Sequence, residues 1–232
     1  MFEKVVLALK CLHERGIVHR DVKPENLMFE SKQTDCKLKL VDFGLAVQLQ
    51  PLSTQSEQTD SQLQSQSQSS QPQQWEKVKK FAGTPEFMAP EVWNDSLYDT
   101  KVDMWSAGCV LYVLLCGVMP FRFDEHRSFD VFGKNINSPN FDALIDNNPF
   151  WKEHVSDSAK DLVKKLLQPS PDLRISADEA ILHPWLKDAS DKIVNDFHFY
   201  QLRATRIRAR FIRNVERVLA VERIIALLSA ES

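Results

Sequence analysis

The spacing of apolar residues along the chain predicts a mainly helical protein. Residues 1–15 carry apolar side chains at helical intervals, which is the pattern of a helix with one buried stripe. Gly16 follows at the position where a C-terminal cap is expected. Residues 106–116 are apolar on all sides, as in a buried helix, and residues 156–167 predict an amphipathic helix that Ser156 can cap.

Shorter elements follow from the same patterns. Residues 36–41 alternate well enough for a strand, and residues 176–182 begin a short helix that Pro184 stops. The helix over residues 1–15 has no capping residue before it. We therefore expect that this element begins upstream of Met1.

Two segments differ from the rest in composition. Residues 48–74 are rich in Gln and Ser and poor in apolar residues, so we expect a disordered insert. Residues 201–228 predict a basic amphipathic helix, with several arginines and an apolar face that includes Phe211 and Val218. Such a helix is typical of a calmodulin target. A packed or partner-binding helix, and contact with a membrane or nucleic acid, are the alternatives.

Composition and charge narrow the class of protein. Of 232 residues, 43% are hydrophobic, and the formal net charge of -3 argues against a chain that binds nucleic acid through bulk charge. The longest apolar run, residues 108–119, is too short to cross a bilayer, and we expect no transmembrane segment. The cysteines lack zinc-site spacing and no secretory signal begins the chain, so we expect a cytoplasmic protein, with the nucleus as the alternative.

The segment His-Arg-Asp-Val-Lys-Pro-Glu-Asn, residues 19–26, concentrates polar side chains in one loop. Asp21 and Lys23 are two positions apart, so in an extended loop they face the same side. A carboxylate that accepts a proton would then lie beside an ammonium that neutralises developing negative charge. Pro24 excludes a regular helix here, and Asn26 offers a neutral oxygen that a hard cation prefers.

Two further segments carry candidate chemistry. Asp42-Phe43-Gly44 directly follows the predicted strand, and the Asp42 carboxylate could hold Mg²⁺ together with Asn26. Gly44 would permit the backbone to turn. Residues 83–91, Gly-Thr-Pro-Glu-Phe-Met-Ala-Pro-Glu, have the prolines and glycine of a loop.

Together, and in this order, the three segments resemble the large lobe of eukaryotic protein kinases, with its H-R-D-x-x-x-x-N, D-F-G and A-P-E motifs. Lys23 and Gly83-Thr84-Pro85 point to the serine/threonine branch. Residues 81–92, 103–108 and 180–185 are most similar to the calcium/calmodulin-dependent group.

This resemblance implies a mainly α fold. Residues 1–188 would form a protein kinase C-terminal lobe, with a short β element at the catalytic loop and with the small lobe absent. Residues 189–232 would form a basic amphipathic regulatory helix. Calmodulin would bind residues 201–228, because in this group a segment after the kinase domain often inhibits the enzyme and binds calmodulin.

The resemblance also implies roles for the matching residues, with ATP and Mg²⁺ as cofactors. Asp21 would orient the Ser or Thr hydroxyl of a protein substrate and accept its proton. Lys23 would stabilise the transferring phosphoryl group, and Asn26 and Asp42 would bind Mg²⁺.

Thr84 would contact Asp21 and Lys23 beside the acceptor, and Glu25 would meet a basic residue of the substrate. The structural residues implied by the resemblance are His19, Arg20, Phe43, Gly44, Glu91, Asp103 and Arg174. Among these, Asp103 would hold the backbone of the catalytic loop, Glu91 would pair with Arg174, and His19 and Phe43 would belong to a hydrophobic spine.

The chain departs from the kinase pattern in ways that bear on activity. No G-x-G-x-x-G phosphate loop and no V-A-I-K strand occur in it, so we predict that the isolated chain has little or no kinase activity. A non-catalytic scaffold or binding module, or a fragment of an incomplete gene model, is the alternative to an enzyme.

The activation segment also departs from the pattern. No Ser or Thr lies between Ser70 and Thr84, where such kinases often carry an activating phosphate. Arg20 could pair with a phosphate from the insert, or the segment could be ordered without one. We expect Cys109 and Cys116 to be packing residues, and His183 to be a packed loop residue.

Overall fold

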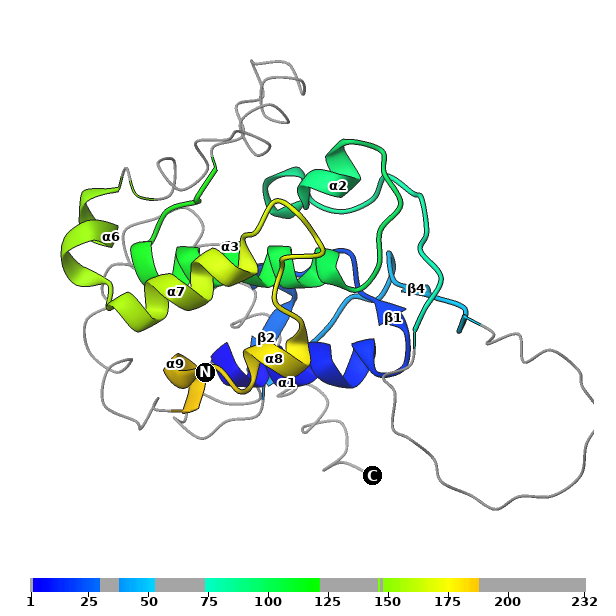
Figure 1. The fold of residues 1–232 in the computed structure, drawn as a ribbon, viewed down its shortest axis with the longest axis horizontal. Helices are drawn as coiled ribbons and strands as arrows, with labels where there is room; N and C mark the ends of the chain where they lie inside the picture. The colour runs from blue at the N-terminus through cyan, green and yellow to red at the C-terminus, as the bar shows by residue number, and fades with distance from the viewer. Residues whose placement is uncertain (1, 30–37, 53–73, 122–145, 147, 188–232) are drawn as a thin grey trace, which may run out of the picture.

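The computed structural model describes residues 2–29, 38–52, 74–121, 146 and 148–187. Helices predominate in this part of the chain, and the strands are short (Figure 1). Most of the predicted insert, at residues 53–73, and the predicted basic helix over residues 201–228 lie outside the described residues.

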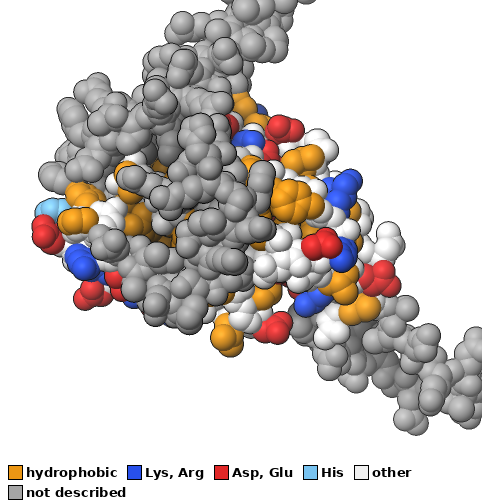
Figure 2. Space-filling model, turned by 90° about the horizontal axis from the view of Figure 1, so that it is seen from above, with side chains coloured by type: hydrophobic (Ala, Val, Ile, Leu, Met, Phe, Trp, Pro, Cys, Tyr) orange, Lys and Arg blue, Asp and Glu red, His pale blue; other side chains and the backbone are white. Residues whose placement is uncertain are grey.

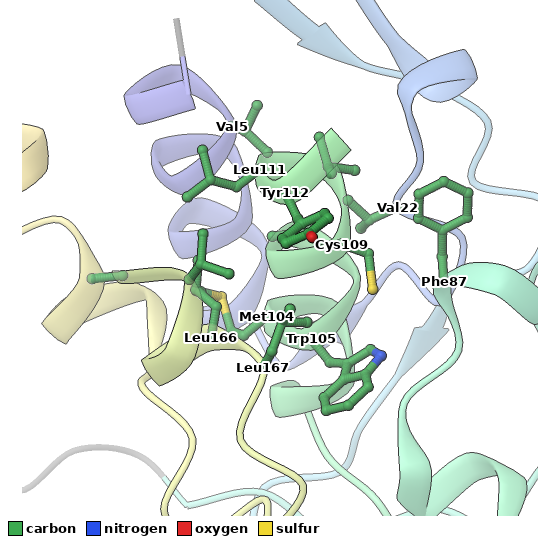
Figure 3. Close-up of a cluster of buried hydrophobic side chains, with 14 of the residues drawn as sticks. Val5, Val22, Phe87, Met104, Trp105, Cys109, Leu111, Tyr112, Leu166 and Leu167 are labelled. Carbon is green, nitrogen blue, oxygen red and sulfur yellow. The ribbon is translucent and has the colours of Figure 1, made fainter. Parts of the chain in front are cut away.

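Helix α3, Lys101–Cys116, is the centre of the packing. All but two of its 16 residues are buried, and it contacts helices α1, α6 and α7. Figure 3 shows apolar side chains of α3 in the core together with residues of α1 and α7. The helix begins five residues before the predicted start at Ser106, because the buried polar residue Asp103 interrupts the apolar pattern.

Helix α7, Asp157–Leu166, lies directly against α3. A Cβ atom added to Gly108 would lie 2.8 Å from the Leu167 side chain and 2.9 Å from Leu166, so only glycine permits this approach. Ser156 caps α7 as predicted, by accepting a hydrogen bond from the Ala159 amide.

Helix α1, Phe2–His13, buries its predicted apolar stripe, and Gly16 follows it with a φ of 67°. Figure 1 shows α1 side by side with the short helix α8, Ala177–Ala180, and these two helices are in contact. Lys10 of α1 binds Asp178 of α8.

The helices near the end of the described chain differ from the prediction. Helix α8 ends at Ala180, and Pro184 begins the next helix, α9, Pro184–Lys187, because proline fits the first turn of a helix. A capping box between Ser176 and Glu179 starts α8. Besides α9, two other short helices were not predicted: α6, Pro149–His154, and α2, Pro90–Trp93.

Two small antiparallel sheets frame the loop of residues 19–26. Strand β1, Ile17–Val18, pairs with β4, Val47–Gln48, and β2, Leu27–Phe29, pairs with β3, Leu38–Leu40. The loop therefore begins after β1 and ends at β2, with the single 3-10 turn η1, Pro24–Asn26, inside it. The predicted strand over residues 36–41 is described as β3.

Residues 50–52 and 74–76 are hydrogen-bonded to each other and form a paired stem at the two ends of the insert, which was predicted over residues 48–74. The Leu52 amide donates to the Gln74 carbonyl at 2.9 Å, and the Glu76 amide donates to the Gln50 carbonyl at 2.8 Å. The Trp75 ring packs against Gly16, where an added Cβ would lie 2.5 Å from the ring. Residues 48–52 and 74 thus belong to the folded part, which corrects the predicted boundaries of the insert.

The described surface is mixed in character. On the face drawn in Figure 2, side chains of both charges stand among apolar ones. In the parts of the chain that the structure describes, no helix has the length and apolarity that crossing a membrane requires.

Candidate active site

Asp21 binds three of the other predicted site residues. The Thr84 hydroxyl donates to Asp21 Oδ1 at 2.6 Å, and the Asn26 amide donates to Oδ2 at 3.0 Å. Lys23 Nζ lies 2.7 Å from Oδ2 and also donates to Thr84 Oγ1 at 2.8 Å. The predicted side-by-side placement of Asp21 and Lys23 is therefore present.

The charge state of Asp21 follows from these contacts. Partial burial alone would raise the pKa of its carboxyl, but hydrogen bonds from Lys23, Thr84 and Asn26 outweigh that effect and lower the pKa. Asp21 is consequently a carboxylate at neutral pH. A carboxylate has about four acceptor directions, and these three partners leave one of them free on Oδ1.

Gly83 brings Thr84 to the catalytic loop. Its φ is 125°, and an added Cβ would lie 2.6 Å from the Arg20 carbonyl oxygen, so a larger residue would push the segment away. Thr84 then precedes the 3-10 turn η2, Pro85–Phe87. Sequence reasoning gave Gly83 no role of its own, because neither its φ nor its contact with Arg20 is visible in a motif.

Asn26 and Asp42 are linked through the backbone. The Val41 amide donates to the Asn26 carbonyl at 2.9 Å, so Asp42 follows directly on a residue tied to Asn26. The Asn26 side-chain NH₂ faces Asp21, which directs its oxygen elsewhere, and Asp42 is exposed, with one oxygen accepting from the Gly44 amide at 3.2 Å. An amide oxygen and an exposed carboxylate fit Mg²⁺, which prefers few protein ligands plus phosphate and water.

A site built from more ligands is not found in the described part of the chain. No group of three or more His, Cys, Asp or Glu side chains there could hold a metal ion. The cysteines Cys109 and Cys116 are buried free thiols, and burial raises the pKa of both. These two residues belong to the core of α3.

The residues of the predicted spine are in contact. The rings of His19 and Phe43 meet edge to face at 5.0 Å, and His19 Nε2 donates to the Val41 carbonyl at 3.1 Å. Gly44 lies in a turn, as predicted: the Ala46 amide donates to the Phe43 carbonyl at 3.0 Å, and a Cβ added to Gly44 would lie 3.2 Å from Asp42 Oδ1. Asp42 itself takes the left-handed backbone conformation, with a φ of 67°, and its side chain secures the turn by accepting from the Gly44 amide.

Asp103 holds the backbone at the start of the catalytic loop. Its side chain is fully buried and accepts hydrogen bonds from the amides of His19 and Arg20, both at 2.8 Å. His13 of α1 binds the same carboxylate at 3.0 Å. Arg20 has a φ of 67°, an unfavourable conformation for a residue with a side chain, and Asp103 secures it.

The predicted pair Glu91–Arg174 is present and buried. Arg174 Nη1 and Nη2 donate to the two Glu91 carboxylate oxygens at 2.6 and 2.9 Å, in a bidentate arrangement. The guanidinium also lies 5.2 Å from the centre of the Trp105 ring. This pair therefore ties the segment that follows Thr84 to the core around α3.

Glu25 lies beside the catalytic cluster and is partly buried. Its Oε2 atom is buried and has no hydrogen-bond partner among the residues that the structure describes. An unpartnered buried carboxylate oxygen is energetically unfavourable.

Comparison with known proteins agrees with this geometry. The family model for the protein kinase domain matches residues 1–186. The chain is 34% identical over 219 residues to calcium-dependent protein kinase 3 of Oryza sativa subsp. japonica. The aligned residues cover 93% of this chain and 34% of that protein. It is 36% identical over 195 residues to calcium/calmodulin-dependent protein kinase type IV of Mus musculus. The aligned residues cover 83% of this chain and 35% of that protein.

The chain therefore belongs to the protein kinase family. Within it, the chain falls in the serine/threonine group that is similar to calcium-dependent and calcium/calmodulin-dependent kinases. It spans about a third of the length of these two relatives.

Replacing Asp103 with asparagine tests its hold on the catalytic loop. We expect Asp103→Asn to lower the free energy of unfolding by about 2–4 kcal/mol, because an NH₂ group would face amide donors. Denaturant unfolding measures the change. Asp95→Asn is the matched control, since Asp95 is exposed and its ion pair with Lys79 should contribute less than about 1 kcal/mol. Equal effects of the two substitutions would contradict the role of Asp103.

Proposed function

We propose that this chain provides the catalytic-loop half of a kinase that transfers the γ-phosphate of ATP to Ser or Thr hydroxyls of proteins. The cluster of Asp21, Lys23 and Thr84 carries the proposal. It joins a carboxylate, a cation and a hydroxyl from two segments that lie far apart in the sequence. Such a set positions an acceptor hydroxyl and a phosphoryl group, which is what phosphoryl transfer requires.

Each residue has a separate task in this reaction. Asp21 accepts a hydrogen bond from the substrate hydroxyl on the free direction of Oδ1, which orients the hydroxyl for attack, and later takes its proton. Because the pKa of Asp21 is lowered, it is a weak base, so the proton moves late, after the bond to phosphorus has begun to form. Lys23 Nζ neutralises charge on the transferring phosphoryl group.

Thr84 fixes the distance between Asp21 and Lys23 by binding both. Asn26 and Asp42 would hold Mg²⁺. When bound, the metal ion neutralises negative charge on the phosphates of ATP.

The test of this function uses protein captured from its own cells with an antibody to residues 190–232. We expect phosphorylation of a basic Ser peptide by the captured protein. Asp21→Asn should lower the rate about 10²–10⁴-fold, because a positioned carboxylate is lost. Asp95→Asn, on an exposed aspartate, is the control and should retain full activity. Equal rates for wild type and Asp21→Asn would refute the proposal.

We further propose that the groups over ATP come from outside these 232 residues. The support is the sequence itself, which holds no Gly-rich phosphate loop. The 26.7 kDa chain alone should then show near-background activity. If the captured protein also has this mass, a non-catalytic scaffold explains the chain better than an enzyme does. If the captured protein is clearly heavier, an active kinase explains it better.

We propose that Glu25 binds a basic residue of the substrate, since it is a partly exposed acidic residue two positions after Lys23 in the same loop. We expect Glu25→Gln to lower kcat/KM about 10–100-fold for a peptide with Arg near the acceptor, because a charge-assisted hydrogen bond is lost. A peptide with a neutral residue in place of Arg is the control and should be phosphorylated equally by both proteins. An equal loss with both peptides would contradict the pairing.

Calmodulin is the partner that we propose for residues 201–228, which the structure does not describe. The support is the basic amphipathic pattern and the similarity to a kinase named for calcium and calmodulin. We also propose the cytoplasm as the compartment, since the described cysteines are free thiols.

A synthetic peptide of residues 200–229 tests the calmodulin proposal. We expect it to bind calmodulin at micromolar concentration or tighter with Ca²⁺ present, because its apolar face needs the groove that Ca²⁺ opens. Isothermal titration with and without a calcium chelator measures this. A peptide with Phe211 and Val218 replaced by Ser keeps the charge and should not bind. The proposal would be contradicted if the natural sequence did not bind calmodulin, or if it bound equally tightly with and without Ca²⁺.

A further inference from the structure

The Arg20 guanidinium is buried, and its partners among the described residues are neutral. Arg20 is 8% exposed, and its Nε donates to the Leu45 carbonyl at 2.5 Å. Its Nη1 donates to the Tyr98 hydroxyl at 3.1 Å. No carboxylate of the described residues lies within ion-pair distance of it. A buried cation requires acceptors, and here they come from a carbonyl and a phenol.

Tyr98, which binds Arg20, also binds residues of the activation segment. Its hydroxyl donates to the Lys80 carbonyl at 2.8 Å, and its backbone exchanges two hydrogen bonds of 2.9 Å with Val78. The Tyr98 side chain is 2% exposed. One hydroxyl therefore joins the catalytic loop, through Arg20, to the segment that leads to Gly83 and Thr84.

The cavity beside these groups is small. A cavity of about 10 Å³ borders Arg20, Tyr98 and Ala82, and its remaining lining is mainly apolar. That volume suits about one water molecule. The nearest Ser or Thr before Thr84 is Ser70, because residues 71–83 contain neither.

We propose that Tyr98 is a positioning residue that holds the activation segment against the catalytic loop without phosphorylation. The Arg20–Tyr98–Lys80 chain of hydrogen bonds supplies the contact that a phosphate on this segment would otherwise make with Arg20. The segment, and with it Thr84, is then ordered from the moment the chain folds. What the ordered segment does rests on the proposed function.

The test measures amide hydrogen exchange in peptides over residues 76–84 of the full chain, without nucleotide or substrate. Tyr98→Phe leaves the backbone bonds to Val78 and removes only the hydroxyl. We expect exchange over 76–84 to rise about tenfold or more, because a buried Arg20 donor and the Lys80 carbonyl lose their partner. Peptides from α7 should change little.

Two control variants separate this role from general stability. Lys80→Ala keeps the carbonyl and should leave exchange over 76–84 unchanged. Tyr112→Phe removes another buried tyrosine hydroxyl, on α3, and should spare this segment. A Tyr98→Phe protein that exchanges like wild type, or faster everywhere by the same factor, would overturn the proposal.

A second measurement needs no variant. Wild-type chain is treated with a phosphatase and checked by intact mass, and we expect the same exchange over 76–84 before and after. Faster exchange after dephosphorylation would mean that a phosphate, and not Tyr98, orders the segment. These exchange measurements use no kinase assay. A negative result would therefore contradict the role of Tyr98 without contradicting the proposed function.

Discussion

The buried carboxylate of Asp103 is the constraint on which the catalytic arrangement depends. It receives the amides of His19 and Arg20 together with a ring nitrogen of His13, so one side chain of α3 joins α1 to the catalytic loop. Only an anion with several acceptor directions can satisfy donors that converge in this way. It also explains why a polar residue lies in the most buried helix, and how Arg20 persists in a left-handed conformation.

From this point the site is assembled outward in two directions. Along the chain, the held backbone carries Asp21, Lys23 and Asn26 into one loop that β1 and β2 anchor at its ends. Across the chain, Gly83 packs on the Arg20 carbonyl and delivers Thr84 to Asp21. Glu91 and Arg174 secure the far end of the same segment, so the Thr84 hydroxyl is fixed from both sides.

Sequence patterns reveal the long helices because packing repeats with the helical period, as in α1 and α7. They place Asp21 beside Lys23, since neighbours in a loop constrain one another. Thr84 and the Glu91–Arg174 pair follow only from the family resemblance, because partners so distant in sequence leave no local pattern. The left-handed backbone of Asp42 and the hydroxyl of Tyr98 were not predicted, because no sequence signal distinguishes these two residues from others of their type.

The stem at Gln50–Leu52 and Gln74–Glu76 has a consequence for how this protein can evolve. Because the Leu52 amide is bonded to the Gln74 carbonyl and Trp75 packs on Gly16, the described residues on the two sides of this stretch lie side by side. Doubling the length of a flexible loop between two such points costs only about 0.6 kcal/mol. Natural variants are therefore expected to differ in length between these two points before they differ in the catalytic loop.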